Sequence, residues 1–84
     1  MTAFYNDGIK YTGAINHTPH DSTEIAANDV KAIKAVDATG EVVYTLNGAD
    51  VTDYFLQGVI YPIGGNLTLI KATGTTATNM VVYY

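Results

Sequence analysis

Two histidines and an aspartate stand close together in the segment His17-Thr18-Pro19-His20-Asp21. Imidazole and carboxylate groups are ligands that zinc and other transition metals use in proteins. Pro19 is incompatible with a helix that presents both histidines on one face, and no fourth ligand follows nearby in the sequence. We therefore interpret the segment as a solvated loop in which Asp and Ser favour a turn, and keep a metal site as the minor alternative.

A second group of oxygen-bearing side chains comprises Asn47, Asp50 and Asp53. Oxygen ligands are what calcium prefers, but the spacing lacks the ligand pattern of an EF-hand and its terminal glutamate. Asn and Asp also favour turns and helix caps by hydrogen bonding to nearby backbone groups. Turn formation and capping are the preferred interpretation, and calcium binding is the alternative.

The sequence offers little for nucleophilic catalysis. It contains no cysteine, and its single serine, Ser22, follows His20 and Asp21 directly in the same apparent loop. Neighbours in sequence do not by themselves form the geometry of a catalytic triad. Gly64-Gly65-Asn66 lacks the spacing and the lysine of a phosphate-binding loop, so it is interpreted as a turn. The sequence predicts a non-enzymatic chain, with no catalytic residue, cofactor site or metal site assigned.

The size and charge of the chain narrow its partners. Eighty-four residues correspond to one domain, and without cysteine there is no disulfide to stabilise it, so we expect a homo-oligomer. Charged residues make up 14%, which implies a largely uncharged surface. Four lysines, no arginine and a net charge of -4 exclude a basic patch for nucleic acid. No apolar run approaches the roughly 20 residues that span a bilayer, so no membrane partner is expected.

Short β-forming runs separated by turn residues dominate residues 30–84. Residues 30–36 and 41–46 flank a four-residue connection and are predicted to form a β-hairpin. Within the second run, alternate side chains fall on one face of a strand, which predicts that this face is buried. The predicted core residues of this run are Val42, Tyr44 and Leu46.

Asn47-Gly48 is a strong turn signal. After it, Asp50 could cap a helical turn over residues 51–56, and an irregular aromatic loop is an equal alternative. Residues 59–61, 67–72 and 79–84 are predicted as further strands. This spacing of short strands predicts an all-β fold, a small antiparallel β-sandwich or barrel-like sheet.

Residues 1–29 show no sustained period and mix isolated aromatics with turn formers, so we expect an extended N-terminal arm over 1–29 and a β domain over 30–84. Tyrosine combines an apolar ring with a hydroxyl and is enriched where protein surfaces meet. Tyr44 and Tyr61 are predicted to pack in the core. Unpaired backbone groups beside the terminal strand would invite strand addition. The predicted interface residues, in the arm and in the terminal strand, are Phe4, Tyr5, Tyr11, Met80, Val82, Tyr83 and Tyr84.

The last third of the chain combines the apolar strand Val59-Ile60-Tyr61-Pro62 with the Gly/Thr-rich segment Ala72–Thr78 and the apolar strand that follows it. In this pattern it resembles small virion proteins of tailed bacteriophages. It implies a structural role, most simply a capsid decoration or cement protein that binds the outer shell and bridges capsid subunits. It also implies the major capsid protein or other virion proteins as partners and a final location in the virion. The N-terminus lacks the charged start and the apolar stretch of a signal peptide, so we expect synthesis in the host cytoplasm.

The alternative is a small carbohydrate- or receptor-binding β module of a phage fibre or tail. Sugars stack on flat aromatic rings flanked by Asp or Asn, and Tyr54 beside Asp53 is the nearest candidate in the sequence.

Overall fold

Seven β-strands form the fold of residues 10–84, which are the residues that the computed structural model describes. No helix occurs in this part of the chain, and so none that could cross a membrane. The prediction of a small all-β antiparallel domain is confirmed. The strands are β1 (Ala14–His17), β2 (Ala32–Ala35), β3 (Gly40–Leu46), β4 (Ala49–Phe55), β5 (Ile60–Pro62), β6 (Leu67–Lys71) and β7 (Met80–Tyr83).

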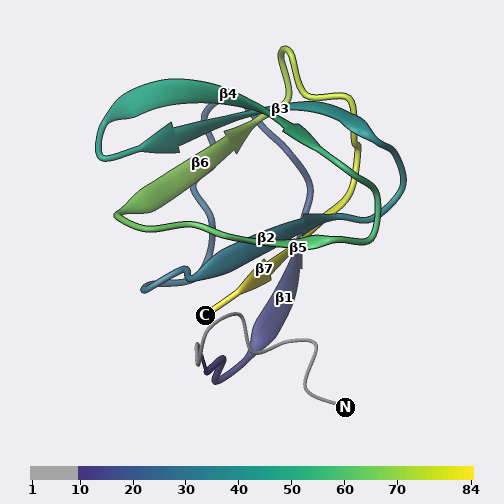
Figure 1. The fold of residues 1–84 in the computed structure, drawn as a ribbon. Coiled ribbons are helices and arrows are strands. Elements are labelled where there is room, and N and C mark those ends of the chain that lie inside the picture. The colour runs from purple at the N-terminus through teal and green to yellow at the C-terminus, as the bar shows by residue number, and fades with distance from the viewer. Residues whose placement is uncertain (1–9) are drawn as a thin grey trace.

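The strands form two antiparallel sheets that lie one above the other (Figure 1). Sheet A has the order β1-β7-β2-β5, and sheet B has the order β4-β3-β6. The connections β2–β3, β4–β5, β5–β6 and β6–β7 each pass from one sheet to the other. Because neighbouring strands of the chain are repeatedly in different layers, the sandwich depends on contacts between residues far apart in sequence.

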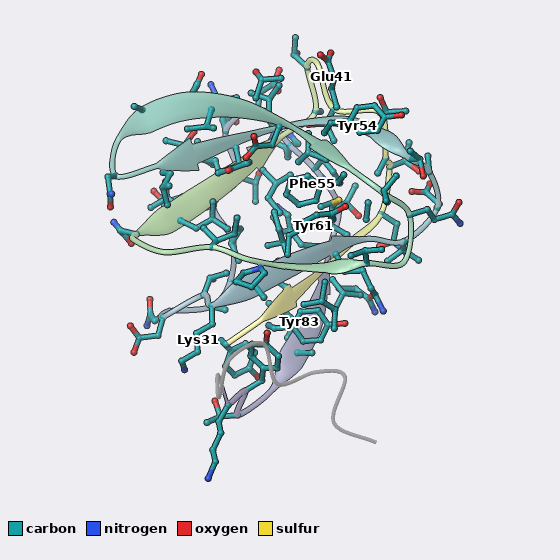
Figure 2. The ribbon with its side chains drawn as sticks, viewed as in Figure 1. Lys31, Glu41, Tyr54, Phe55, Tyr61 and Tyr83 are labelled. Carbon is teal, nitrogen blue, oxygen red and sulfur yellow. The ribbon has the colours of Figure 1, made fainter. Side chains whose placement is uncertain are left out.

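The core lies between the two sheets, where alternate residues of each strand meet. Phe55 of sheet B and Tyr61 of sheet A point toward one another there, with ring centroids 4.4 Å apart (Figure 2). Burying one large apolar side chain completely contributes about 1.5–3 kcal/mol, so a few such residues stabilise a domain of this size. The largest fully buried side chains are Ile33, Met80 and Val82 from sheet A and Val42, Phe55 and Ile70 from sheet B.

A two-residue turn at Asn47-Gly48 joins β3 to β4, as the sequence predicted. Both residues have positive φ, 52° and 83°, which is the conformation of a type I′ hairpin turn. The helical turn or irregular loop predicted for residues 51–56 is wrong, because β4 runs through Phe55 as a strand. The hairpin turn places the residues after it beside β3, and the resulting ladder outweighs the weak strand propensity of aspartate.

The predicted hairpin of residues 30–36 and 41–46 is also wrong, since β2 belongs to sheet A and β3 to sheet B. The Asp37 carboxylate accepts hydrogen bonds from the backbone N–H of Thr78 (3.1 Å) and of Asn79 (3.2 Å), and from the Thr78 hydroxyl. These bonds hold the connection to the segment before β7, so the chain crosses between sheets instead of reversing. The core prediction within β3 is confirmed, with Val42 and Tyr44 buried and Leu46 partly buried against them.

Much of the predicted arm belongs to the sandwich. β1 pairs with β7, and Ile25 is buried in the core. The predicted boundary between residues 29 and 30 therefore does not divide the described structure. β1 has only four residues, which is too short for the alternation of a strand to be recognised in the sequence. Its residues were therefore interpreted as part of an arm with isolated aromatics. The arm stays a prediction for residues 1–9, which lie outside the described residues.

β7 confirms the predicted terminal strand, but its backbone is paired on both sides. It lies between β1 and β2 in sheet A, so the strand addition expected beside it does not fit this fold. After β7, the Tyr84 carbonyl accepts bonds from the backbone N–H groups of Thr12 and Gly13, and the Tyr84 N–H donates to the Gly13 carbonyl. The two ends of the described chain are thus fastened together.

Candidate interaction surface

The outer face of sheet A is almost free of charge. In each strand of this sheet the residues between the core positions point outward, and register brings them into rows across the sheet. We call this surface, together with the adjacent Tyr11, the tyrosine face. Lys34 is its one charged residue. The face comprises Tyr11, Ala14, Asn16, Lys34, Ile60, Pro62, Val81 and Tyr83. Ala32 has the same outward position in the ladder, but it is fully buried and does not contribute to the accessible surface.

Tyr83 lies at the centre of the contacts on the tyrosine face. Its ring lies on the side of sheet A opposite to Phe55 and Tyr61 (Figure 2). The Tyr11 ring packs on it with centroids 5.3 Å apart at 41°, and the Lys34 ammonium lies 5.9 Å from its centroid, within cation–π range. The result is an ordered aromatic surface with a single positive charge beside it.

The predicted interface residues separate into distinct environments. Tyr11 and Tyr83 lie on the tyrosine face, whereas the side chains of Met80 and Val82 are fully buried in the core. A partner therefore cannot contact those two side chains in this fold. Strand alternation instead directs the side chain of Val81 outward. The run of apolar residues 80–84 did not reveal which of them face the core.

The remaining predicted residues are at the ends of the chain. Tyr84 packs its ring over Gly13, where an added Cβ would lie only 2.6 Å from the ring, so a side chain at residue 13 has no room. Phe4 and Tyr5 lie outside the described residues.

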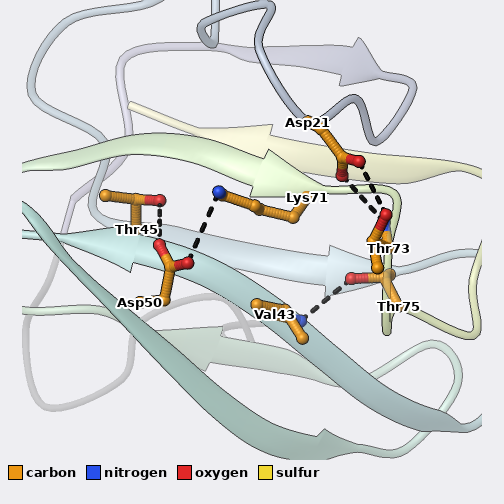
Figure 3. A network of polar contacts seen from close by, with 7 residues as sticks. All are labelled: Asp21, Val43, Thr45, Asp50, Lys71, Thr73 and Thr75. Carbon is orange, nitrogen blue, oxygen red and sulfur yellow. Dashed lines mark hydrogen bonds and ion pairs between the residues drawn. The ribbon is translucent and has the colours of Figure 1, made fainter.

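The side chains of His17, His20 and Asp21 do not point toward a common site. His17 points into the sandwich and is 8% exposed, and its Nε2 has no hydrogen-bond partner. Burial, and secondarily the charge of His20, lowers the pKa of His17 below its ordinary 6.5. The Asp21 carboxylate instead accepts bonds from Thr73, from the backbone N–H (2.8 Å) and the hydroxyl (2.6 Å) (Figure 3). Within residues 10–84, no three acidic or histidine side chains are placed to hold a metal ion.

His20 acts in local structure. Its Nδ1 accepts hydrogen bonds from the backbone N–H of Ser22 (3.1 Å) and of Thr23 (3.0 Å). The Ser22 hydroxyl is 3.4 Å from the same nitrogen, but Asp21 is bound to Thr73 and does not orient the imidazole. The three residues form a turn that fastens to the segment after β6 and do not have the arrangement of a catalytic triad.

The oxygen-bearing group around β4 is likewise separated. The Asn47 side chain accepts a bond from the Asn66 backbone N–H at 2.8 Å. Asp50 accepts a bond from the Thr45 hydroxyl at 2.8 Å and forms an ion pair with Lys71 at 3.4 Å (Figure 3). The Thr45 bond, more than Lys71, lowers the pKa of Asp50. Each oxygen group therefore has its own protein partner.

Asp53 is on the opposite face of β4 from Asp50 and accepts a hydrogen bond from the Tyr44 hydroxyl. Burial, reinforced by this carboxylate, raises the pKa of Tyr44 to about 12. Tyr54 is 64% exposed on the outer face, so it and Asp53 do not form one platform for a sugar. The geometry thus gives no support to the carbohydrate alternative.

Sequence reasoning missed the connection between β4 and β5. Leu56 is 52% exposed and Val59 is 42% exposed, yet the loop that carries them is well fastened. Gln57 bonds to the Thr39 hydroxyl and to the Val36 carbonyl, and the N–H of Leu56 donates to the Tyr61 hydroxyl. Thr39 and Val36 are distant from Gln57 in sequence, so the local pattern of residues 56–59 did not indicate that the loop is fastened to them.

Comparison with solved structures identifies the family of this antiparallel β-sandwich. No protein-family model and no curated protein matches the chain. The chain is similar to a chain of the capsid of a native GTA (gene transfer agent) particle computed with C5 symmetry. The two are 30% identical with a TM-score of 0.73, and the match covers 89% of this chain and 84% of that one. The chain belongs to the family of this capsid component.

Proposed function

We propose that this chain is a non-enzymatic structural protein of a phage-like virion, and that it acts as a capsid decoration or cement protein. In this role it binds the outer shell and stabilises the head by bridging capsid subunits. The observation that carries the proposal is the similarity to a capsid chain over nearly the whole length of both proteins. The partners are the major capsid protein or other virion proteins.

The tyrosine face supports a docking role. It exposes aromatic and aliphatic groups with one charge among them, a composition that favours contact with another protein. Four strands about 4.8 Å apart and three to four residues long cover on the order of 250 Å². Burying this face and an equal area of a partner removes about 500 Å², well below the roughly 1,200 Å² of a stable pairwise interface.

Weak single contacts suit a cement protein that is present in many copies. Each copy attaches to an ordered lattice, so the stability of the shell grows through effective concentration without tight binding at any one site. The homo-oligomer predicted from the sequence fits this mechanism. Phe4, Tyr5 and Tyr84 extend the proposed contact beyond Tyr11 and Tyr83.

Particles from a producer in which the gene is deleted test the proposal. We expect them to form but to lose integrity at lower temperature than the parent particles, and purified protein added back should restore both occupancy and heat resistance. Mass spectrometry and imaging of the particles measure occupancy. Absence of the protein from purified parental particles would overturn the proposal.

A further inference from the structure

The two edge strands of sheet B, β6 and β4, differ in whether their outer backbone groups are hydrogen bonded. Along β6, the backbone N–H groups of His20 and Ile25 donate to the carbonyls of Ile70 and Thr68, both at 2.9 Å. The loop after β1 thus covers this edge. Along β4, among residues 10–84, no backbone hydrogen bond is made on the side away from β3. One edge is closed, and the other is open over seven residues.

The hairpin turn determines which backbone groups face the open edge. Leu46 and Ala49 flank the two-residue turn, so they exchange both of their N–H···O bonds. Alternation along β4 then directs the N–H and C=O groups of Asp50, Thr52 and Tyr54 away from β3. All three residues are exposed, so this row of donors and acceptors is accessible.

The edges of sheet A are less suitable for pairing. β1 has four residues, and β5 has three and ends with Pro62, which has no N–H to donate. β4 is therefore the longest open edge in the described part of the chain. An added strand is held mainly by main-chain bonds, which require such a row.

The charge of the edge selects the kind of strand that can join it. Asp50 and Asp53 lie on β4 itself, and Glu41 is opposite Tyr54 on β3. If β4 paired with β4 of a second copy, the Asp50 carboxylates of both copies would share one face of the junction and the Asp53 carboxylates the other, and Lys71 forms an ion pair with Asp50 only. Like charges across paired strands are destabilising, so the edge disfavours its own copy and favours a basic partner.

We propose that β4 accepts an extended strand from another polypeptide, which bears Lys or Arg beside Asp50 and completes sheet B as a fourth strand. The inference rests on the proposed function, in which this polypeptide is a subunit of the capsid shell. The tyrosine face and the β4 edge lie on different sheets. Together they give one copy two attachments and allow it to bridge neighbouring subunits.

Thr52→Pro tests the proposal directly. The Thr52 N–H points away from β3, so proline removes a donor of the open edge without removing a bond of the β3–β4 ladder. The preceding residue, Val51, is already extended, as a residue before proline prefers. Thr52→Ala is the matched control, because it loses the same side chain and keeps the N–H. The probe is capsid particles that lack the protein.

We expect Thr52→Pro to bind these particles at least about tenfold more weakly than wild type and Thr52→Ala to bind like wild type. Circular dichroism establishes that both variants are folded. Equal binding by wild type and Thr52→Pro would overturn the inference and leave the proposed function standing. Absence of wild-type binding would overturn both.

Amide hydrogen exchange on wild-type protein gives a second measurement that does not depend on a variant. In the free protein, the N–H groups of Asp50, Thr52 and Tyr54 should exchange faster than those of Val51 and Asp53, which pair with β3. Attachment to particles should protect the first three. Unchanged exchange on attachment would contradict the proposal, as would protection caused by self-association of the free protein.

Discussion

The outer faces of the two sheets differ, although their inner faces contribute to one core. Of the eight outward strand residues of sheet A, Lys34 is the one with a charge. Sheet B has three charged residues among its eight, and two of them, Asp50 and Lys71, are paired with each other. Alternation produces both faces, so the difference comes from residue choice alone. In the proposed function, the face of sheet A contacts another protein and the more charged face of sheet B is directed to solvent. The outward residues of sheet B are Glu41, Val43, Thr45, Asp50, Thr52, Tyr54, Leu69 and Lys71.

The largest effects should come from the core, where the sheets are equivalent. Ile33 of sheet A and Ile70 of sheet B are both fully buried. We expect Ile33→Ala and Ile70→Ala each to lower the free energy of unfolding by about 2–5 kcal/mol, because each leaves a cavity. Urea unfolding followed by circular dichroism measures both. A cost below about 1 kcal/mol for one of them would show that the two inner faces are not equivalent.

The next prediction compares the outer faces directly. Val81 of sheet A and Leu69 of sheet B are partly buried apolar residues that point outward. We expect Val81→Asp to weaken attachment to capsid particles about tenfold or more, because it places a charge in the contact. Leu69→Asp should leave attachment nearly unchanged. Sedimentation of particles with bound protein measures this, and equal losses for the two variants would remove the functional distinction.

As the pH falls, the first loss of stability should come from His17 in sheet A. The folded pKa of His17 lies below its ordinary 6.5, so the unfolded chain binds the proton more readily. The stability that neutral His17 provides is present above pH 6.5 and is lost as the pH falls through the lowered folded pKa. The pKa values of Asp21, Asp37 and Asp50 are lowered, chiefly by bonds from threonine side chains, so their contribution is lost only below about pH 4. Urea midpoints between pH 8 and about pH 4 should fall in wild type.

His17→Leu is the control for this prediction. It removes the buried imidazole and should flatten the dependence between pH 8 and about pH 5 while leaving the decrease at lower pH. The same slope in both proteins would contradict the assignment to His17.

The smallest effect concerns the hydrogen bond between Tyr44, on the central strand of sheet B, and Asp53 on β4. The folded pKa of Tyr44 is about 12, against an ordinary 10. Its contribution to stability is therefore complete below pH 10 and is lost as the pH rises through 12. Spectrophotometric titration of the phenolate should show a tyrosine that ionises near this pH in wild type and not in Tyr44→Phe. Titration curves of identical shape would show that Tyr44 is not the group responsible.

Local signals in the sequence predicted where strands and turns occur better than they predicted which strands pair with one another. The turn at Asn47-Gly48 and the burial of Val42 and Tyr44 follow from turn chemistry and strand alternation, which act over a few residues. The partner of β2 could not be predicted in this way. Asp37 has the composition of a turn, but its carboxylate bonds to Thr78, which is distant in sequence.

The candidate surface was predicted only in part for a related reason. Aromatic composition identified Tyr11 and Tyr83, but their contact joins residues at opposite ends of the described chain. A run of apolar residues does not reveal which of its members face the core. The sequence therefore predicted Met80 and Val82 at the interface, whereas Val81 is the residue that points outward. The open edge of β4 depends on sheet order, which single-sequence patterns do not determine.

The central position of β7 has a consequence for protein synthesis. Sheet B lies within residues 40–71, so it can form while later residues are still being translated. β1 pairs with β7 alone among the described strands, and β7 carries Tyr83. A polypeptide that stops before β7 therefore leaves β1 without a neighbour and lacks the centre of the tyrosine face. In the proposed function, such a product lacks the surface that contacts the shell, so we expect it to remain unattached.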